Sequence, residues 1–234
     1  MFYNPEINLN TESFFFNKEE SKHIVKVNRK QSGDILLVTN GLGILFTTEI
    51  TLASDSKCTV KVISKKVAEK PSYNLHLAVA PTKMNERFEW FLEKATEIGI
   101  TTITPIICDH SERKVINKER FEKIILAAMK QSNQYYLPKL NDAMSFADFI
   151  VKSNNDTKLI AHCAEENEKK SLKDILQPNE NITVLIGPEG DFSPKEITLA
   201  IEKKYSPVSL GNTRLRTETA AIVACHSVAF VNEI

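Results

Sequence analysis

The first third of the chain alternates short runs of β-branched and aromatic residues with turn-forming segments. The apolar runs lie at residues 35–38, 44–50 and 58–63, and glycine-containing turns lie at residues 32–34 and 40–43. Short strands joined by tight turns are typical of all-β units. This part of the sequence therefore predicts a small antiparallel β-barrel.

The pattern changes near Lys70 and Pro71. Beyond this point, apolar strand candidates alternate with amphipathic helical segments, which predicts a parallel sheet covered by helices. We therefore expect two domains, residues 1–70 and residues 71–234. One helix is expected around Phe88, Phe91, Leu92, Ala95 and Ile98, which have helical spacing, and another at residues 118–131. The expected strands are residues 75–80, 102–107, 159–163, 183–186 and 208–210.

Two segments in the last quarter of the chain carry most of the chemistry. Residues 185–193 have the sequence LIGPEGDFS, and residues 210–220 have the sequence LGNTRLRTETA. Each follows a predicted strand and opens on a glycine, which is where α/β proteins present backbone groups to ligands. Gly187, Gly190 and Gly211 allow a positive φ or a close approach to a flat ligand. The alternative is that the glycines of the first segment only form a turn.

A helix is expected directly after the first segment. Ser193 and Glu196 have the spacing of a capping box, with Pro194 at the first helical position. Another helix is expected to begin at Thr217 or Glu218.

Arg214 and Arg216 precede that last helix. Positive charge at a helix N-terminus opposes the helix dipole, so we expect these arginines to meet an anion such as a phosphate. In the alternative interpretation, Arg216 pairs with Glu218 or Glu189 and braces the loops. Both glutamates are expected to act as braces rather than as bases.

Composition and charge narrow the function classes. The 234 residues are 42% hydrophobic and 26% charged, and 30 basic residues balance 30 acidic ones, so an RNA partner would need a local basic patch. The longest apolar run, residues 220–231, is too short for a membrane span, and we expect no signal peptide. The GxGxxG and GxxxxGK[ST] motifs are absent, which argues against Rossmann-type dinucleotide binding and a phosphate loop.

Cysteines and histidines give no metal signature. Cys58, Cys108, Cys163 and Cys225 are far apart, and we expect buried free thiols in a reducing cytoplasm. The five histidines lack ligand spacing, so no metal is expected. His76 and His162 fall in predicted strands and are expected to be hydrogen-bonded core or rim residues.

The two glycine-containing segments resemble the signature loops of the SPOUT RNA methyltransferases. Within that superfamily the chain is similar to the bacterial enzymes that methylate N3 of a uridine in 16S ribosomal RNA, because both strings occur there in this order. The resemblance implies an α/β fold in which an N-terminal PUA-like RNA-binding β-barrel precedes a SPOUT domain with a deep trefoil knot. It also implies a cytoplasmic homodimer that acts on ribosomal RNA in the assembled small subunit.

The same resemblance implies S-adenosyl-L-methionine as the cofactor, with Arg216 as the catalytic residue that stabilises the uridine anion. The implied cofactor-binding residues are Ile186, Gly187, Pro188, Glu189, Gly190, Leu210, Gly211, Leu215 and Thr217. The implied RNA-binding residues are Arg29, Lys83, Arg87, Arg113 and Arg214.

Two residues depart from the family pattern, and two other functions stay open. Asp191 stands where the family usually has a second glycine, and Gln134 stands where an arginine usually follows the Gln-Ser pair. A SPOUT enzyme that modifies a ribose 2′-hydroxyl or a tRNA base is one alternative, and a non-catalytic RNA-binding protein is another.

Overall fold

The computed structural model describes residues 1–152, 157–164 and 169–232. The chain divides into two compact units. Met1–Lys70 and Met129–Leu137 form the first unit, and Pro71–Ala128 and Pro138–Ile234 form the second. The sequence pattern assigned residues 129–137 to the second part of the chain, but in the structure they pack with the first.

The first unit is built on a sheet with the strand order β1-β3-β4-β5-β2. Adjacent strands of this sheet run antiparallel, except that β1 and β3 run parallel. The predicted antiparallel pairing is therefore confirmed for every pair but that one. Leu36 and Val38 of β3 are buried and alternate with the exposed Ile35 and Leu37, as expected for a strand with one covered face. The elements are β1 (Phe2–Tyr3), β2 (Ser13–Phe15), α1 (Lys18–Lys22), the π-helix η1 (His23–Val27), β3 (Ile35–Thr39), β4 (Ile44–Leu52) and β5 (Thr59–Val67).

Hydrogen bonds attach the segment Met129–Leu137 to the first unit. The N–H of Leu137 donates to the carbonyl of Gly41, and the N–H of Gly43 donates to the carbonyl of Tyr135, both at 2.9 Å. Gly43 has a φ of +88°, and a Cβ there would overlap the ring of Tyr136. This site therefore requires glycine both for its backbone conformation and for its packing.

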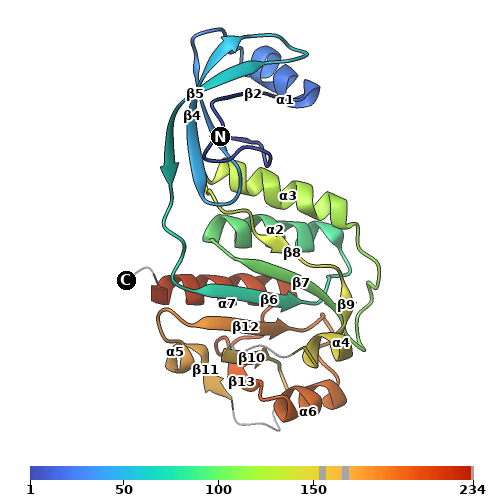
Figure 1. The fold of residues 1–234 in the computed structure, drawn as a ribbon. Helices are drawn as coiled ribbons and strands as arrows, with labels where there is room; N and C mark the ends of the chain where they lie inside the picture. Colours follow the sequence, from blue (N-terminus) through green and yellow to red (C-terminus); the bar gives the residue numbers. More distant parts are fainter. Residues whose placement is uncertain (153–156, 165–168, 233–234) are drawn as a thin grey trace. The chain divides into compact units, whose positions relative to one another are not determined.

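The second unit contains a parallel sheet with the order β11-β13-β10-β12-β6-β7-β8, and β9 also pairs with β7 (Figure 1). The parallel sheet expected from the alternating pattern is thus confirmed. The main strands are β6 (Asn74–Val79), β7 (Thr102–Ile107), β10 (Thr157–Ala161), β12 (Asn181–Ile186) and β13 (Ser206–Ser209). The short ones are β8 (Lys139–Leu140), β9 (Met144–Ser145) and β11 (Lys170–Ser171).

Helices cover both faces of this sheet. α7 (Thr217–Asn232) packs against α2 (Asn85–Ile98), β6 and β12, and Figure 1 shows α2 and α7 on the same side of the sheet. α4 (Phe146–Ile150) and α6 (Pro194–Glu202) pack on the other face, in one core with Ile160 and Leu185. Burying a large apolar side chain stabilises by roughly 1.5–3 kcal/mol, so this two-sided burial fixes the central strands. The remaining helices are α3 (Lys118–Gln131) and α5 (Leu172–Ile175).

The predicted helices at Asn85–Ile98 and Lys118–Gln131 are confirmed. β10 differs from its prediction because it ends at Ala161, so that His162 and Cys163 follow the strand instead of ending it. Cys163 is consequently exposed, whereas Cys58, Cys108 and Cys225 are buried free thiols as expected. Burial raises the pKa of Cys225 to about 12.

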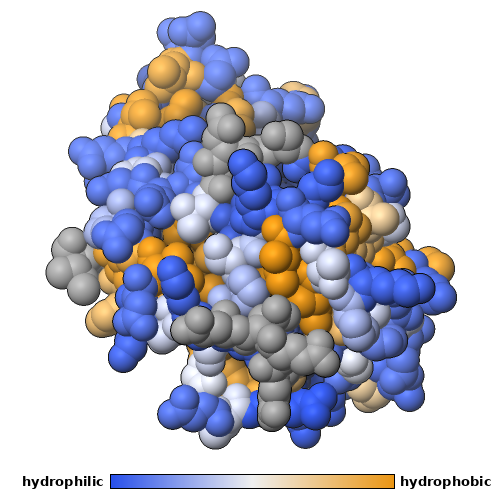
Figure 2. All heavy atoms as spheres, turned by 90° about the horizontal axis from the view of Figure 1, so that it is seen from below, coloured by the Kyte–Doolittle hydropathy of each residue, from blue (hydrophilic) through white to orange (hydrophobic). Residues whose placement is uncertain are grey.

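The surface mixes hydrophobic and hydrophilic side chains. On the face drawn in Figure 2, hydrophilic residues interrupt the hydrophobic areas. No helix among the described residues has the length and apolar character needed to cross a membrane.

Candidate functional site

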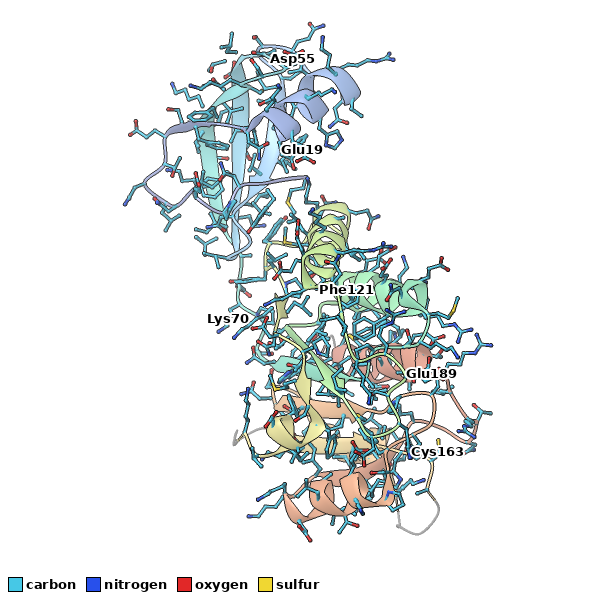
Figure 3. The ribbon with its side chains drawn as sticks, turned by 90° about the vertical axis from the view of Figure 1, so that its right-hand side faces the viewer. Glu19, Asp55, Lys70, Phe121, Cys163 and Glu189 are labelled. Carbon is cyan, nitrogen blue, oxygen red and sulfur yellow. The ribbon has the colours of Figure 1, made fainter. Side chains whose placement is uncertain are left out.

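Three strand ends meet at one edge of the parallel sheet. β10 lies between β12 and β13, and Ala161 is in register with Ile186 on one side and Val208 on the other. Because parallel strands end at the same edge, the segments that follow them become neighbours. We call residues 187–193 the first loop and residues 210–216 the second loop. Figure 3 shows Cys163 and Glu189 on the same side of the second unit.

Hydrogen bonds hold the first loop at its start and at its end. The hydroxyl of Thr217 donates to the carbonyl of Gly187 at 3.0 Å, which ties the loop to the start of α7. At the other end, Ser193 and Glu196 form the predicted capping box of α6. The hydroxyl of Ser193 also donates to Asp109 at 2.6 Å. The loop is therefore fixed between two helix N-termini.

Glu189 connects the first loop to the segment that follows β6. Its carboxylate accepts a hydrogen bond from the backbone N–H of Lys83 at 3.0 Å. The guanidinium of Arg113 donates to the carbonyl oxygens of Thr82 (3.1 Å) and Lys83 (2.7 Å). The ammonium of Lys83 pairs with Glu112 at 2.7 Å, and this hydrogen bond raises the pKa of Lys83. Glu189, Lys83 and Arg113 thus brace neighbouring segments.

Asp191 is the most connected residue of the first loop. It has a φ of 64°, a left-handed conformation that glycine adopts more easily. Its carboxylate accepts hydrogen bonds from the backbone N–H of Cys163 (2.8 Å) and from that of Phe192 (2.9 Å). Its carbonyl, like that of Gly190, lies 3.0 Å from Nδ1 of His110. Carbonyl oxygens only accept, so His110 carries a proton on Nδ1.

Gly187 and Gly190 are closely packed against other residues of the protein. A Cβ at Gly187 would lie 3.1 Å from the ring of Phe192, and a Cβ at Gly190 would lie 3.1 Å from Cβ of His110. Neither position uses the positive φ that glycine allows, and the expectation that they leave room for a ligand stays a prediction.

The second loop has few internal contacts. Gly211 has a φ of +136°, and a Cβ there would meet nothing within 4 Å. Its N–H donates to the hydroxyl of Ser209 at 3.3 Å. The backbone N–H groups of residues 212–215 donate no hydrogen bond to any residue that the structure describes. These groups are available to a ligand.

Arg214 and Arg216 are exposed on this loop. Neither forms an ion pair within the described part of the chain. The alternative partners of Arg216 are engaged elsewhere: Glu218 lies 3.9 Å from Nε of Arg87, and Glu189 accepts from a backbone N–H. Bracing by Arg216 is therefore not observed, and its guanidinium is free to meet another group.

A cavity of about 640 Å³ lies between the two loops. This volume is in the range of small-molecule sites, roughly 300–1,000 Å³. The sequence-predicted residues that line it are Ile186, Gly187, Pro188, Glu189, Leu210, Gly211, Arg214, Leu215, Arg216 and Thr217. Gly190 does not line it, nor do Lys83, Arg87 and Arg113, and Arg29 belongs to the first unit.

His162 also lines this cavity and was not selected from the sequence as a site residue. It is only 7% exposed, yet neither ring nitrogen has a hydrogen-bond partner among the described residues. Burial lowers the pKa of His162, as does nearby Lys169, while Asp191 opposes the shift. The expectation of a hydrogen-bonded core or rim residue is correct for His76, which is partly buried and whose Nε2 lies 2.7 Å from the hydroxyl of Thr104. For His162 no described residue provides such a partner. Its place directly after a central parallel strand was the signal that could have identified it.

Most of the chain matches two protein families of RNA methyltransferases. Residues 68–229 match the family described as RNA methyltransferase domain, and residues 16–63 match the RNA methyltransferase PUA domain. A protein of Buchnera aphidicola named ribosomal RNA small subunit methyltransferase E is 33% identical over 94% of this chain and 88% of its own length. A protein of the same name from Rickettsia conorii is 34% identical over 88% of this chain and 85% of its own length.

Solved structures agree in fold over nearly the whole chain. A probable rRNA methyltransferase from Porphyromonas gingivalis has a TM-score of 0.92 and 38% identity, and the match covers 99% of this chain and 98% of that one. A putative methyltransferase from Legionella pneumophila, solved with the bound cofactor SAM, has a TM-score of 0.87 and 30% identity. That match covers 99% of this chain and 97% of the other.

Proposed function

The chain belongs to the RNA methyltransferase family, and on that basis we propose that it transfers a methyl group from S-adenosyl-L-methionine to ribosomal RNA of the small subunit. The observation that carries this proposal is the cavity between the two loops. Its walls combine a first loop held by several hydrogen bonds with a second loop whose backbone N–H groups and two arginines have no hydrogen-bond or ion-pair partner, respectively, among the described residues. Similarity to relatives named as small-subunit rRNA methyltransferases supports the RNA target.

The residues present fit the proposed cofactor. The cavity is large enough for a nucleoside-sized molecule, and the imidazole of His162, which has no hydrogen-bond partner among the described residues, provides a polar group that a ligand can satisfy. The second loop would hold the purine through its backbone, and the first loop would form the opposite wall. When bound, S-adenosyl-L-methionine supplies an activated methyl group on a sulfonium.

The chain's own contribution is to orient the acceptor and to stabilise its charge. We place N3 of a uridine as the acceptor atom, which becomes nucleophilic once its proton has left. The guanidinium of Arg216 would donate hydrogen bonds to O2 or O4 of the uracil and stabilise the anion, as in an oxyanion hole. Its freedom from ion pairs with the described residues supports this role.

RNA binding is assigned to both units. Arg29 is exposed in the first unit, where it would contact a phosphate, and Arg214 would do so beside the cavity. Lys83, Arg87 and Arg113 already have protein contacts, so any RNA contact by them would be additional to bracing. In this proposal residues 1–70 act as the RNA-binding domain and residues 71–234 as the methyltransferase domain.

Three further features are proposed from family membership. They are a trefoil knot in the second domain, a homodimer, and action in the cytoplasm on the assembled small subunit. The exposed ring of Phe230 on α7, 57% accessible, supports a partner surface on that helix. Sedimentation at micromolar concentration tests the dimer.

A methylation assay on isolated small subunits tests the proposed function. Subunits from a strain without this gene would be incubated with the protein and labelled S-adenosyl-L-methionine, and the rRNA nucleosides analysed by mass spectrometry. N3-methyluridine is the expected product. A 2′-O-methylated nucleoside, or methylation of tRNA alone, would show a different RNA target. Binding of RNA without any methylated product would show a non-catalytic RNA-binding protein.

A further inference from the structure

His162 occupies the central position between the two loops. It directly follows β10, whose last residue Ala161 pairs with β12 on one side and β13 on the other. The backbone N–H of the next residue, Cys163, is held by the carboxylate of Asp191 at 2.8 Å. The backbone is therefore fixed on both sides of His162, and the side chain can reorient only about its own bonds.

The imidazole of His162 differs from those of His76 and His110 because no described residue forms a hydrogen bond with it. It is 7% exposed, and both ring nitrogens are shielded from solvent without a hydrogen bond to the described residues. His76 and His110, in contrast, each have a polar partner within 3.0 Å. Leaving buried polar atoms unpaired is costly, so a group that enters the cavity should satisfy them.

The ring can present a nitrogen to the cavity without moving its centre. A half turn about χ2 exchanges the positions of carbon and nitrogen atoms, and the two orientations are nearly equal in shape. Side-chain rotations of this kind are common when a ligand binds. Burial and the charge of Lys169 disfavour protonation of the ring, whereas the charge of Asp191 favours it. A neutral imidazole has one donor nitrogen and one acceptor nitrogen.

We propose that His162 is a specificity-determining residue for the methyl donor and that its imidazole hydrogen-bonds to a ribose hydroxyl of S-adenosyl-L-methionine. This inference rests on the function proposed above. A hydroxyl both donates and accepts, which matches a neutral imidazole, whereas a carboxylate only accepts and an ammonium only donates. The N–H groups of residues 212–215 donate to no described residue and would serve the purine in the proposed function, so we assign the ribose to His162.

The test is a binding cycle with S-adenosylhomocysteine and its 2′-deoxy and 3′-deoxy analogues, measured by titration calorimetry. His162→Phe keeps a planar ring but removes both nitrogens. We expect it to bind S-adenosylhomocysteine about tenfold more weakly than wild type does, the effect of one lost hydrogen bond. Wild type should bind one of the two deoxy analogues about tenfold more weakly than it binds S-adenosylhomocysteine. His162→Phe should bind that analogue and S-adenosylhomocysteine with equal affinity.

Controls separate this inference from folding and from the proposed function. His76→Phe removes a partly buried imidazole that does not line this cavity and should keep the wild-type preference for the hydroxyl. Should His162→Phe fail to fold, ¹⁵N resonances of the His162 ring in wild type provide the second measurement. They should shift on addition of S-adenosylhomocysteine and shift less with the critical deoxy analogue.

Two results overturn the inference. In the first, removal of either hydroxyl weakens binding by the same factor in wild type and in His162→Phe, or the ring resonances respond equally to all three ligands. His162 then forms no hydrogen bond with a ribose hydroxyl, and the proposed function stands. If wild type binds none of the ligands, the proposed function fails together with this inference.

Discussion

The first and second loops face the same cavity but are built in opposite ways. The first loop is bonded to α7, to the segment after β6, to His110 and to the end of β10. The second loop has a glycine with open space around it and two arginines without ion pairs to the described residues. The rigid loop is suited to fixing the shape of the site. The sparsely bonded loop is suited to responding to what binds there, because groups without internal partners gain most from a ligand.

The largest effect is expected from removing the free guanidinium of the second loop. Arg216→Ala should lower the rate of single-turnover methylation about 10- to 150-fold, because a charge-assisted hydrogen bond worth roughly 1.5–3 kcal/mol is lost in the transition state. Affinity for the methyl donor should stay nearly unchanged. Arg214→Ala, on the same loop, is the matched control and should weaken RNA binding while the saturated rate is kept. A normal rate for Arg216→Ala at saturation would remove its catalytic role.

Stability should depend on the first loop instead. Asp191→Ala removes the acceptor of two backbone N–H groups and keeps a Cβ at a φ of 64°. We expect a loss of about 2 kcal/mol in the free energy of unfolding, measured by urea denaturation. Asp191→Asn retains an amide oxygen and should lose less. Equal stability of Asp191→Ala and wild type would mean that these contacts do not hold the loop.

Gly211→Ala tests whether the second loop depends on backbone conformation alone. Its Cβ meets no atom within 4 Å, so the expected cost of about 1 kcal/mol comes from the φ of +136°. The loop can relax because few contacts hold it, and donor affinity should fall more than stability does. Calorimetry and thermal unfolding of the same variant separate the two effects. A loss of stability larger than that of Asp191→Ala would reverse the comparison.

The sequence predicted the positions of both loops but not this difference between them. Buried strands that end at a glycine are visible in the sequence, and the capping box at Ser193 is a local signal, so both were found. Two contacts of Asp191, to Cys163 and to His110, join residues 28 or more positions apart and leave no periodic pattern. The attachment of residues 129–137 to the first unit also rests on long-range hydrogen bonds, to Gly41 and Gly43. Such pairings appear only once the chain is folded.

At Gly187, too, the sequence predicted the position but not the contact that explains it. The sequence indicated that it needs to lack a side chain, but Phe192, five residues later, is the neighbour responsible. Gly187→Val would therefore disturb the core as well as the cavity and is a poor test of ligand binding. His162 was assigned to a strand interior because the apolar run continues to Cys163, although the strand ends at Ala161.

The smallest expected effect is the pH dependence of folding stability that arises from His162, which lies between the two loops. Burial lowers the pKa of this imidazole from 6.5 in the folded protein, so the unfolded chain takes up a proton first as the pH falls. Folding stability should therefore be unaffected by this group above about pH 6.5 and should fall below it, until the folded pKa is reached. One proton gives a slope of at most about 1.36 kcal/mol per pH unit.

Urea unfolding between pH 7.5 and pH 5 should show that this pH dependence of the free energy of unfolding is smaller in His162→Phe than in wild type. In Asp191→Asn the loss should extend to lower pH, because the carboxylate that favours protonation of His162 is gone. If His162→Phe and wild type lose stability in parallel over this range, other groups carry the acid sensitivity.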